Sequence, residues 1–184
     1  IGDTNNELVK QQLIDNLALF RQIYQFAPQA IAVDCHAGYF THQRGLALAD
    51  ELQVPYVEVL HHHAHIVSVM AEHNLQGQVI GLALDGIGMG ENQQLWGGEC
   101  LLADDKTCYH LGGLPAVALP GGDRAAVEPW RNFLAHLQQF VPDWQIWMTR
   151  RGINTDWPLL AKAIERKLNC PPISSAGRLF DAVA

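Results

Sequence analysis

The chain has 184 residues, of which 48% are hydrophobic and 17% charged, a composition that fits a globular protein with a sizeable core and excludes a disordered one. Its formal net charge of −7, without a basic stripe, disfavours nucleic acid as a partner. No signal peptide and no apolar run of membrane-spanning length is present, so we expect no membrane association. The four cysteines lack CxxC spacing, which indicates reduced thiols in a cytoplasmic protein: Cys35, Cys100, Cys108 and Cys170.

The first third of the chain alternates helix and strand patterns. Apolar residues at helical spacing predict a long amphipathic helix over 5–26. A short buried strand at 30–34, a helix at 41–52 with Thr41 as its N-cap, and a strand at 55–60 follow. This alternation predicts an α/β layered domain.

Two groups of polar residues leave the ends of these strands. Asp34, Cys35 and His36 follow the first strand together, and for them a structural role is the favoured interpretation. After the second strand come four histidines within five positions: His61, His62, His63 and His65. If a helix begins near His61, then His61 and His65 lie on one face and can share one cation. The alternative is a chance cluster at a solvated helix start, and two ligands still need a third.

A glycine-rich stretch follows the next predicted strand. The apolar run 79–84 predicts a buried strand, and Asp85-Gly86-Ile87-Gly88-Met89-Gly90 comes directly after it. Alternating glycines let the backbone turn tightly and present its N–H groups to an anion. For the glycines alone a simple tight hairpin is the favoured interpretation, and Asp85 at the strand end shifts it towards metal or nucleotide handling. Another strand is predicted at 95–103, so the pattern indicates a hairpin and excludes a Rossmann loop or a P-loop, which need a following helix.

The second half contains further predicted elements. We expect an extended segment at 109–119, then a helix capped by Asp123 that runs to about Phe140, with Pro129 either in its first turn or breaking it. The stretch 144–157 is irregular, and 158–168 is helical. The chain starts at Ile1 and stops inside the amphipathic stretch 174–184 without a C-cap, so we expect a piece of a longer protein.

Four stretches in this order resemble one family: LHHHAHI, ALDGIGMGENQQLWGGE, LPGGDRAAVEPWR and SSAGRLFDAVA. They are similar to the HypF carbamoyltransferases of [NiFe]-hydrogenase maturation, in the portion that resembles TsaD, the tRNA threonylcarbamoyl-transfer protein. The resemblance covers essentially the whole chain. It implies an α/β fold of the actin-like ATPase (ASKHA) type with a mixed sheet and flanking helices, here truncated. The first lobe would span about 1–120 and the start of the second about 121–184.

The resemblance also implies a reaction. A carbamoyl group would pass from carbamoyl-adenylate, made from carbamoyl phosphate and ATP by an upstream YrdC-like domain, to the C-terminal cysteine of HypE. The product supplies the cyanide ligands of the hydrogenase. The expected partners are HypE and the remaining HypF domains, and the expected cofactor is a divalent metal, zinc or iron.

Site residues carry over from the resemblance by position. The metal-binding HxxxH falls on His61 and His65, while His62 and His63 would support these ligands or face the substrate. The third metal ligand is expected beyond Ala184, so we expect this chain alone to be inactive.

The substrate-binding strand and turn of the family fall on Asp85, Gly86 and Gly88, and its nucleotide-contacting aspartate falls on Asp181. Ile87 stands where the family usually has Thr, so a hydroxyl is missing there. The role of Asp85 stays open between orienting the ligand, binding the metal through water and capping the turn. No residue is assigned as catalytic.

Three other functions are compatible with parts of this sequence. A TsaD-type enzyme acting on tRNA is disfavoured by the acidic balance and by the HHHAH and PGGD…EPWR motifs. A non-catalytic metal-binding or interaction module stays open. A metallohydrolase is weakened because His62, not Glu, follows His61, so no HExxH is present.

Overall fold

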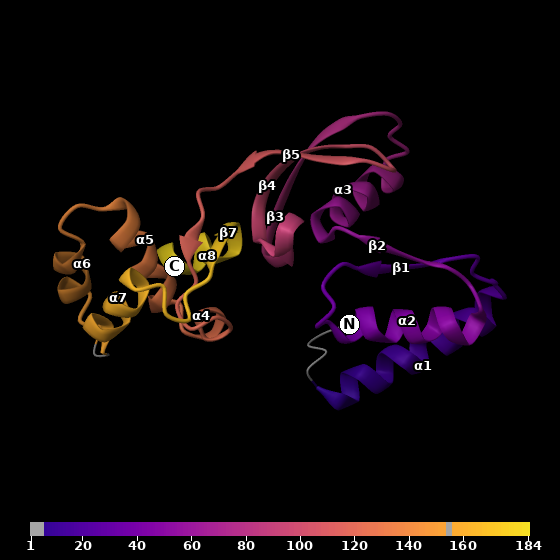
Figure 1. The fold of residues 1–184 in the computed structure, drawn as a ribbon, viewed down its shortest axis with the longest axis horizontal. Coiled ribbons are helices and arrows are strands. Elements are labelled where there is room, and N and C mark those ends of the chain that lie inside the picture. The colour runs from indigo at the N-terminus through magenta and orange to yellow at the C-terminus, as the bar shows by residue number, and fades with distance from the viewer. Residues whose placement is uncertain (1–5, 154–155) are drawn as a thin grey trace. The chain divides into compact units, whose positions relative to one another are not determined.

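The computed structural model describes residues 6–153 and 156–184 and shows a mixed α/β protein (Figure 1). The chain forms two compact units, residues 1–61 and residues 62–184. This boundary differs from the lobe boundary expected near residue 120, which stays a prediction about the family's lobes.

The first unit contains two helices and a two-stranded parallel sheet. Its elements are α1 (Glu7–Tyr24), β1 (Ile31–Asp34), α2 (Phe40–Leu52) and β2 (Tyr56–Val59). All four lie where the sequence predicts them. The Asn6 side chain caps α1 by accepting a 2.9 Å hydrogen bond from the backbone N–H of Leu8. The apolar stripe expected on α1 is not buried, since no residue of this helix is buried.

The predicted N-cap of the second helix is wrong. Helix α2 begins at Phe40, so Thr41 lies inside its first turn. The N-cap residue is Tyr39, whose side chain makes no capping hydrogen bond. The start of this helix is therefore set by the extended backbone at Tyr39 and not by a capping hydroxyl at Thr41.

The second unit is built on a curled mixed sheet. Its elements are α3 (His61–Glu72, which starts at the last residue of the first unit), β3 (Val79–Met89), the 3₁₀ turn η1 (Glu91–Gln93), β4 (Leu95–Ala103), β5 (Cys108–Gly113), β6 (Val117–Ala118), α4 (Arg124–Val127), α5 (Trp130–Phe140), α6 (Trp144–Arg150), α7 (Trp157–Glu165), β7 (Pro172–Ser175) and α8 (Ala176–Val183). The strand order is β3-β4-β7-β6, with β5 also paired to β4. Only the β4–β7 pair is parallel, so the sheet is mixed, as expected.

Helix α3 covers one face of the β3-β4-β5 sheet. Ile66 and Met70 pack against a buried cluster that includes Trp96, Leu101 and Ala103. Gly81 of β3 lies directly beneath Ile66, because a Cβ at Gly81 would come within 2.6 Å of Ile66 Cγ1. The helix therefore approaches the strand more closely than any larger residue at position 81 would allow.

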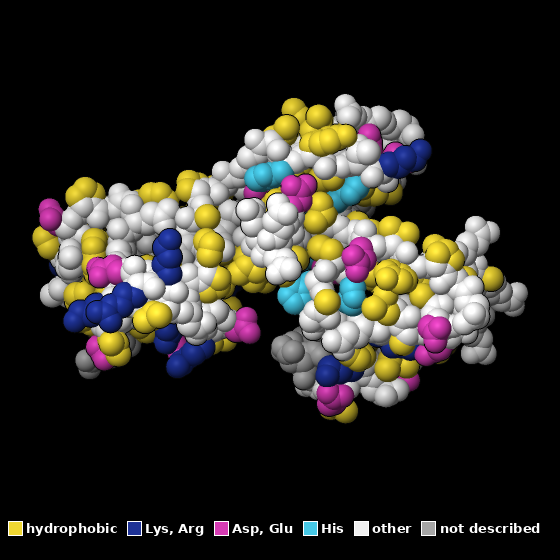
Figure 2. All heavy atoms as spheres, viewed as in Figure 1, with side chains coloured by type: hydrophobic (Ala, Val, Ile, Leu, Met, Phe, Trp, Pro, Cys, Tyr) yellow, Lys and Arg dark blue, Asp and Glu magenta, His cyan; other side chains and the backbone are white. Residues whose placement is uncertain are grey.

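The opposite face of this sheet is exposed, which corrects the prediction of a buried strand at 79–84. Ile80, Leu82 and Leu84 are 69%, 72% and 66% exposed, whereas Ala83 between them is 5% exposed. Hydrophobic side chains are visible at the surface over these strands (Figure 2). A continuous apolar run is compatible with two-sided burial, but within this chain only one face is covered.

The hairpin is confirmed, but its reversal lies later than predicted. Strand β3 continues through Gly86 and Gly88 to Met89, with a register irregularity between Leu84 and Gly88. The chain reverses at 90–94, where Gly90 N–H donates to the carbonyl of Gln94. The alternating glycines therefore extend a strand and do not form the expected tight turn.

The second half also differs from expectation in three places. The segment 109–119 forms two strands, β5 and β6, instead of one. The helix expected from Asp123 to Phe140 is broken into α4 and α5 at Pro129, which lies at the N-cap position of α5, and Asp123 makes no side-chain cap. The stretch expected to be irregular contains helix α6, and residues 154–155 lie outside the described residues.

Leu134, Met148 and Ala161 join α5, α6 and α7 in a second buried cluster.

The four cysteines are free thiols, as the sequence indicates. Burial raises the pKa of the thiols of Cys35, Cys108 and Cys170, because an enclosed site disfavours the thiolate. At pH 7.5 we therefore expect iodoacetamide to alkylate each of them more slowly than glutathione, with rates that rise as the pH is raised. Peptide-level mass spectrometry measures the rates, and a rate equal to that of glutathione at any of the three would contradict the expectation.

Candidate metal and substrate site

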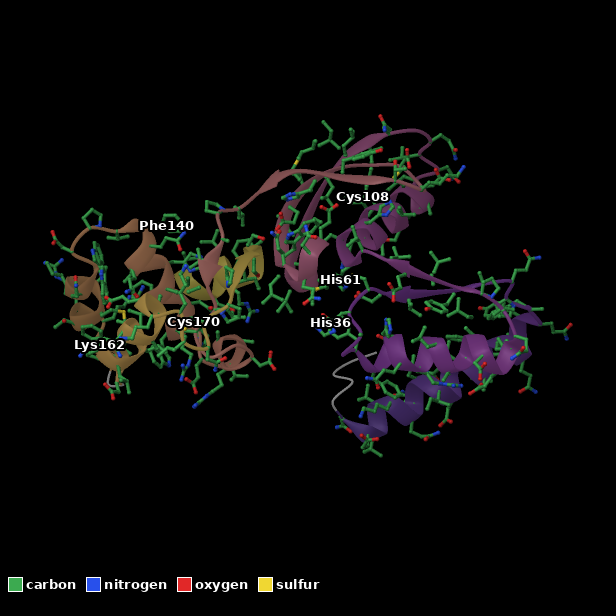
Figure 3. The ribbon with its side chains drawn as sticks, in the orientation of Figure 1. His36, His61, Cys108, Phe140, Lys162 and Cys170 are labelled. Carbon is green, nitrogen blue, oxygen red and sulfur yellow. The ribbon has the colours of Figure 1, made fainter. Side chains whose placement is uncertain are left out.

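The first part of the site lies where the two parallel strands of the first unit end. Asp34 is the last residue of β1 and stands opposite Val59, two residues before His61. Its Oδ2 lies 2.6 Å from His61 Nδ1, and Figure 3 shows His61 and His36 near this edge. Asp34 Oδ1 also accepts the backbone N–H of His36 at 2.8 Å. The carboxylate thus engages Nδ1 of His61, which leaves Nε2 as its ligand atom.

Helix α3 places two histidines for a shared cation. His61 is the first residue of the helix, so the helix fixes its position relative to His65, four residues later. Nε2 of His65 lies 3.8 Å from Oδ2 of Asp85, at the bend of β3. One ligand atom from each of His61, His65 and Asp85 lies within 4.8 Å of the other two. Ligands of a tetrahedral zinc are about 3.4 Å apart, so this set fits a divalent ion after small side-chain adjustments.

The other two histidines of the cluster have different surroundings. His62 is fully buried, with its ring 6.1 Å from that of Trp96 and its Nε2 3.9 Å from Asp85 Oδ2. His63 turns to the far end of the hairpin, where its Nε2 lies 2.7 Å from the carbonyl oxygen of Asp104. These positions suit His62 to support the Asp85 side of the ligand set and His63 to anchor the β4–β5 turn.

The strand at Asp85 and Gly86 packs tightly against the start of helix α8. Gly86 N–H donates to Asp85 Oδ1 at 2.6 Å, and Ser175 Oγ donates to the Gly86 carbonyl at 2.6 Å. A Cβ at Gly177 would lie 2.8 Å from Gly86 Cα, so only glycine fits there without a shift. Gly88 lies further along the strand, paired with Trp96. The predicted substrate residues Asp85 and Gly86 are thus held against α8.

Asp181, predicted to contact a nucleotide, is engaged by protein side chains. Its Oδ2 lies 3.1 Å from Arg178 Nη1 and accepts a 3.4 Å hydrogen bond from Asn132 Nδ2. Asn132 is 1% exposed and also donates to the carbonyl of Ala125 at 2.7 Å. The aspartate therefore connects α8 to α5.

Sequence reasoning missed two functional candidates, Asp34 and Arg178. For Asp34 the sequence alone favours a structural role. The signal for it was present, since neighbouring parallel strands end at the same edge of a sheet and β2 leads into His61. Arg178 lies within the SSAGRLFDAVA motif, but a single arginine on a short helix has no spacing pattern that marks it. Only the packing of α8 on β3 reveals its position.

No helix among the described residues is long and apolar enough to cross a membrane.

Comparison with known proteins matches two neighbouring family models. Residues 81–184 match the second subdomain of the Kae1-like domain of carbamoyltransferase, and residues 1–72 match the HypF Kae1-like domain. Carbamoyltransferase HypF2 of Cupriavidus necator is 42% identical over 184 residues, which cover 100% of this chain and 23% of that protein. Carbamoyltransferase HypF of Rhodobacter capsulatus is 38% identical over 190 residues, which cover 100% of this chain and 25% of that protein.

Solved structures give the same result. The crystal structure of full-length HypF in the phosphate- and nucleotide-bound form matches with a TM-score of 0.88 and 35% identity, covering 100% of this chain and 24% of that one. T. kodakarensis HypF matches with a TM-score of 0.85 and 31% identity. The chain thus spans about a quarter of the length of its relatives. It belongs to the HypF family and corresponds to a part of that family's Kae1-like domain.

Proposed function

We propose that this chain is part of a carbamoyltransferase that passes a carbamoyl group from carbamoyl-adenylate to the C-terminal cysteine of HypE, for the cyanide ligands of [NiFe]-hydrogenase. The observation that carries the proposal is the set of His61, His65 and Asp85 on α3 and β3, within a chain of the HypF family. In this reaction the acyl C–O bond to the adenylate phosphate breaks, a C–S bond forms, the thiol proton is released and AMP leaves.

The chain's own residues suit the handling of a divalent metal, zinc or iron. Imidazole nitrogens and a carboxylate are ligands that both ions accept. His61, His65 and Asp85 would hold the ion, and Asp34 would keep the ring of His61 oriented by engaging Nδ1. When bound, the ion would supply positive charge that stabilises the leaving phosphate. An aspartate beyond Ala184, implied by the family resemblance, would complete the set, so the 184 residues alone should not catalyse transfer.

The reaction is tested with a full-length family protein that contains this chain. Carbamoyl phosphate, ATP and a peptide with the C-terminal sequence of HypE are added, and peptide mass reports carbamoylation of the cysteine. We expect transfer by the full-length protein and none by the 184-residue chain supplied with carbamoyl-adenylate. Transfer to tRNA and not to the peptide would favour the TsaD-type alternative, and neither product would favour a non-catalytic module.

Asp34 provides a separate prediction about the metal. Replacing Asp34 with Asn should lower the metal affinity by about 10- to 100-fold, because the His61 ring loses its charged partner. Isothermal titration of the metal-free full-length protein with Zn²⁺ measures the change. Asp50→Asn, an exposed substitution on α2, is the matched control and should leave the affinity unchanged. Equal affinities for the two variants would show that Asp34 does not support a ligand.

A further inference from the structure

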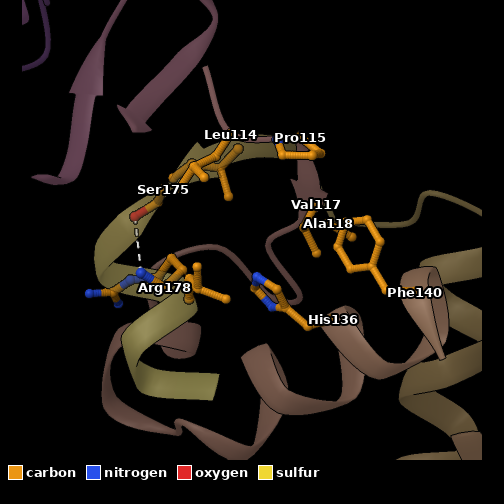
Figure 4. Close-up of a pocket in the computed structure, with 10 residues that line it drawn as sticks. Leu114, Pro115, Val117, Ala118, His136, Phe140, Ser175 and Arg178 are labelled. Atoms are coloured by element: carbon orange, nitrogen blue, oxygen red, sulfur yellow. Dashed lines mark hydrogen bonds between the residues drawn. The ribbon is translucent and has the colours of Figure 1, made fainter. Parts of the chain in front are cut away.

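The positively charged side chain of Arg178 lies close enough to Asp85 and Gly86 to contact a ligand bound along them. Its Nη2 lies 3.6 Å from where a Cβ on Gly86 would stand, so the guanidinium lies beside the bare backbone of this glycine. The backbone of Arg178 is fixed by Ser175 Oγ, which accepts its N–H at 3.0 Å (Figure 4). Since Ser175 also donates to the Gly86 carbonyl, one hydroxyl ties the arginine to the strand.

The guanidinium group keeps donors available. Arg178 is 18% exposed at its side chain, and Nη1 is paired with Asp181. Its Nε is buried and makes no hydrogen bond to the protein, and among the described residues Nη2 has no acceptor. A buried donor without a partner points to a group that is absent from the protein itself, such as a ligand oxygen or a water. Guanidinium donors match the oxygens of a phosphate in geometry and charge.

Asp181 and Asn132 hold this arginine from the other side. The aspartate is paired with Arg178 Nη1 and receives the Asn132 amide, whose own position is fixed by burial and by the Ala125 carbonyl. An aspartate with these two partners is suited to orienting the guanidinium. Both partners contact Oδ2 of Asp181, so the carboxylate is held between α8 and α5.

We propose that Arg178 contacts the phosphate of the nucleotide bound along Asp85 and Gly86, and that Asp181 acts as a positioning residue for Arg178 instead of contacting the nucleotide. The inference rests on the proposed function, since Arg178 would pair with the negatively charged phosphate of the carbamoyl-adenylate that the proposed reaction uses. It also assigns to Asp181 a role different from the one implied by the family resemblance.

Comparing AMP with adenosine separates a phosphate contact from a loss of structure. In a full-length family protein containing this chain, Arg178→Gln should weaken AMP binding at least about tenfold and leave adenosine binding unchanged, since a charge-assisted hydrogen bond is lost only for the ligand that has a phosphate. Arg124→Gln, an exposed arginine on α4, is the matched control and should change neither. Any nucleotide site elsewhere in the full-length protein is the same in every variant, so differences in affinity between the variants report on position 178. Arg178→Lys, which keeps the charge, serves if the glutamine variant does not fold, and should give a smaller loss of AMP affinity.

The role of Asp181 is tested in the same assay. Asp181→Asn should weaken AMP binding but not adenosine binding, and the double variant with Arg178→Gln should bind AMP no more weakly than Arg178→Gln alone. A loss of adenosine affinity in Asp181→Asn would show that the aspartate contacts the nucleoside directly and would overturn its positioning role. Unchanged AMP affinity in Arg178→Gln and Arg178→Lys would overturn the phosphate contact while leaving the proposed function intact. If the unaltered protein bound neither AMP nor adenosine, the nucleotide site of the proposed function would be refuted together with this inference.

Discussion

Replacing His65 with alanine is expected to lower the metal affinity of a full-length family protein containing this chain by on the order of 100-fold or more. Loss of a residue that only supports a ligand costs 10- to 100-fold, so loss of a ligand itself should reach at least the upper end of that range. Carbamoyl transfer should fall with it. Zn²⁺ titration and the peptide carbamoylation assay measure the two effects.

The histidine cluster supplies its own control for this experiment. His63 lies on the same helix two residues earlier, but its Nε2 is directed to the carbonyl of Asp104. His63→Ala should therefore retain metal binding, and circular dichroism should show both variants folded. If His63→Ala lost the metal while His65→Ala kept it, the assignment of ligands to the faces of α3 would be wrong.

Replacing Glu99 with alanine should destabilise the second unit by about 3 kcal/mol, the upper end of the cost of leaving a buried hydrogen-bonding group without its partner. Glu99 is 2% exposed and joins three strands. Its Oε2 lies 2.7 Å from His110 Nε2 on β5, and its Oε1 accepts a hydrogen bond from Ser174 Oγ on β7. Without the carboxylate, the Ser174 hydroxyl keeps only its 3.5 Å contact with the Leu95 carbonyl, and the backbone N–H groups of Gly97 and Gly98 each lose one acceptor in a buried place.

Thermal unfolding followed by circular dichroism measures this effect. For a chain of this size the expected loss corresponds to a fall in Tm of roughly 6–12 °C. Glu99→Gln keeps the size and one acceptor oxygen and should lose less, and the exposed Glu72→Ala should stay within about 0.5 kcal/mol of the unaltered chain. Equal Tm values for Glu99→Ala and Glu72→Ala would show that the three-strand network contributes little.

Much of the secondary structure could be predicted because local signals were strong. The alternation over 30–60, the helix beginning at His61 and the strand at 95–103 all correspond to observed elements. The errors arose where tertiary pairing outweighs local preference. The alternating glycines favour a turn, but β3 pairs with β4 as far as Met89. One-sided exposure at Ile80 could not be foreseen, because an apolar run does not show which of its faces is covered.

The candidate site was predictable only where it depends on local sequence signals. The i, i+4 spacing of His61 and His65 is a local property of one helix, and the structure places both on it. The approach of Asp85 to His65 depends on how α3 packs on β3, and the pairing of Arg178 with Asp181 depends on where α8 lies. Contacts between elements distant in sequence have no periodic signature, so spacing alone could not assign Asp85 to the histidines.

The close approach of α3 to Gly81 also sets the span of the ligand set. Ile66 follows His65 on the helix, and Gly81 precedes Asp85 by four residues on the strand, so the separation of His65 from Asp85 depends on the spacing between these two layers. A methyl group at position 81 would meet Ile66 Cγ1 within 2.6 Å and push the helix outward. Such a shift would widen the distance between His65 and Asp85. Gly81→Ala should therefore shift the preference of the site towards larger cations, although residue 81 does not contact the ion.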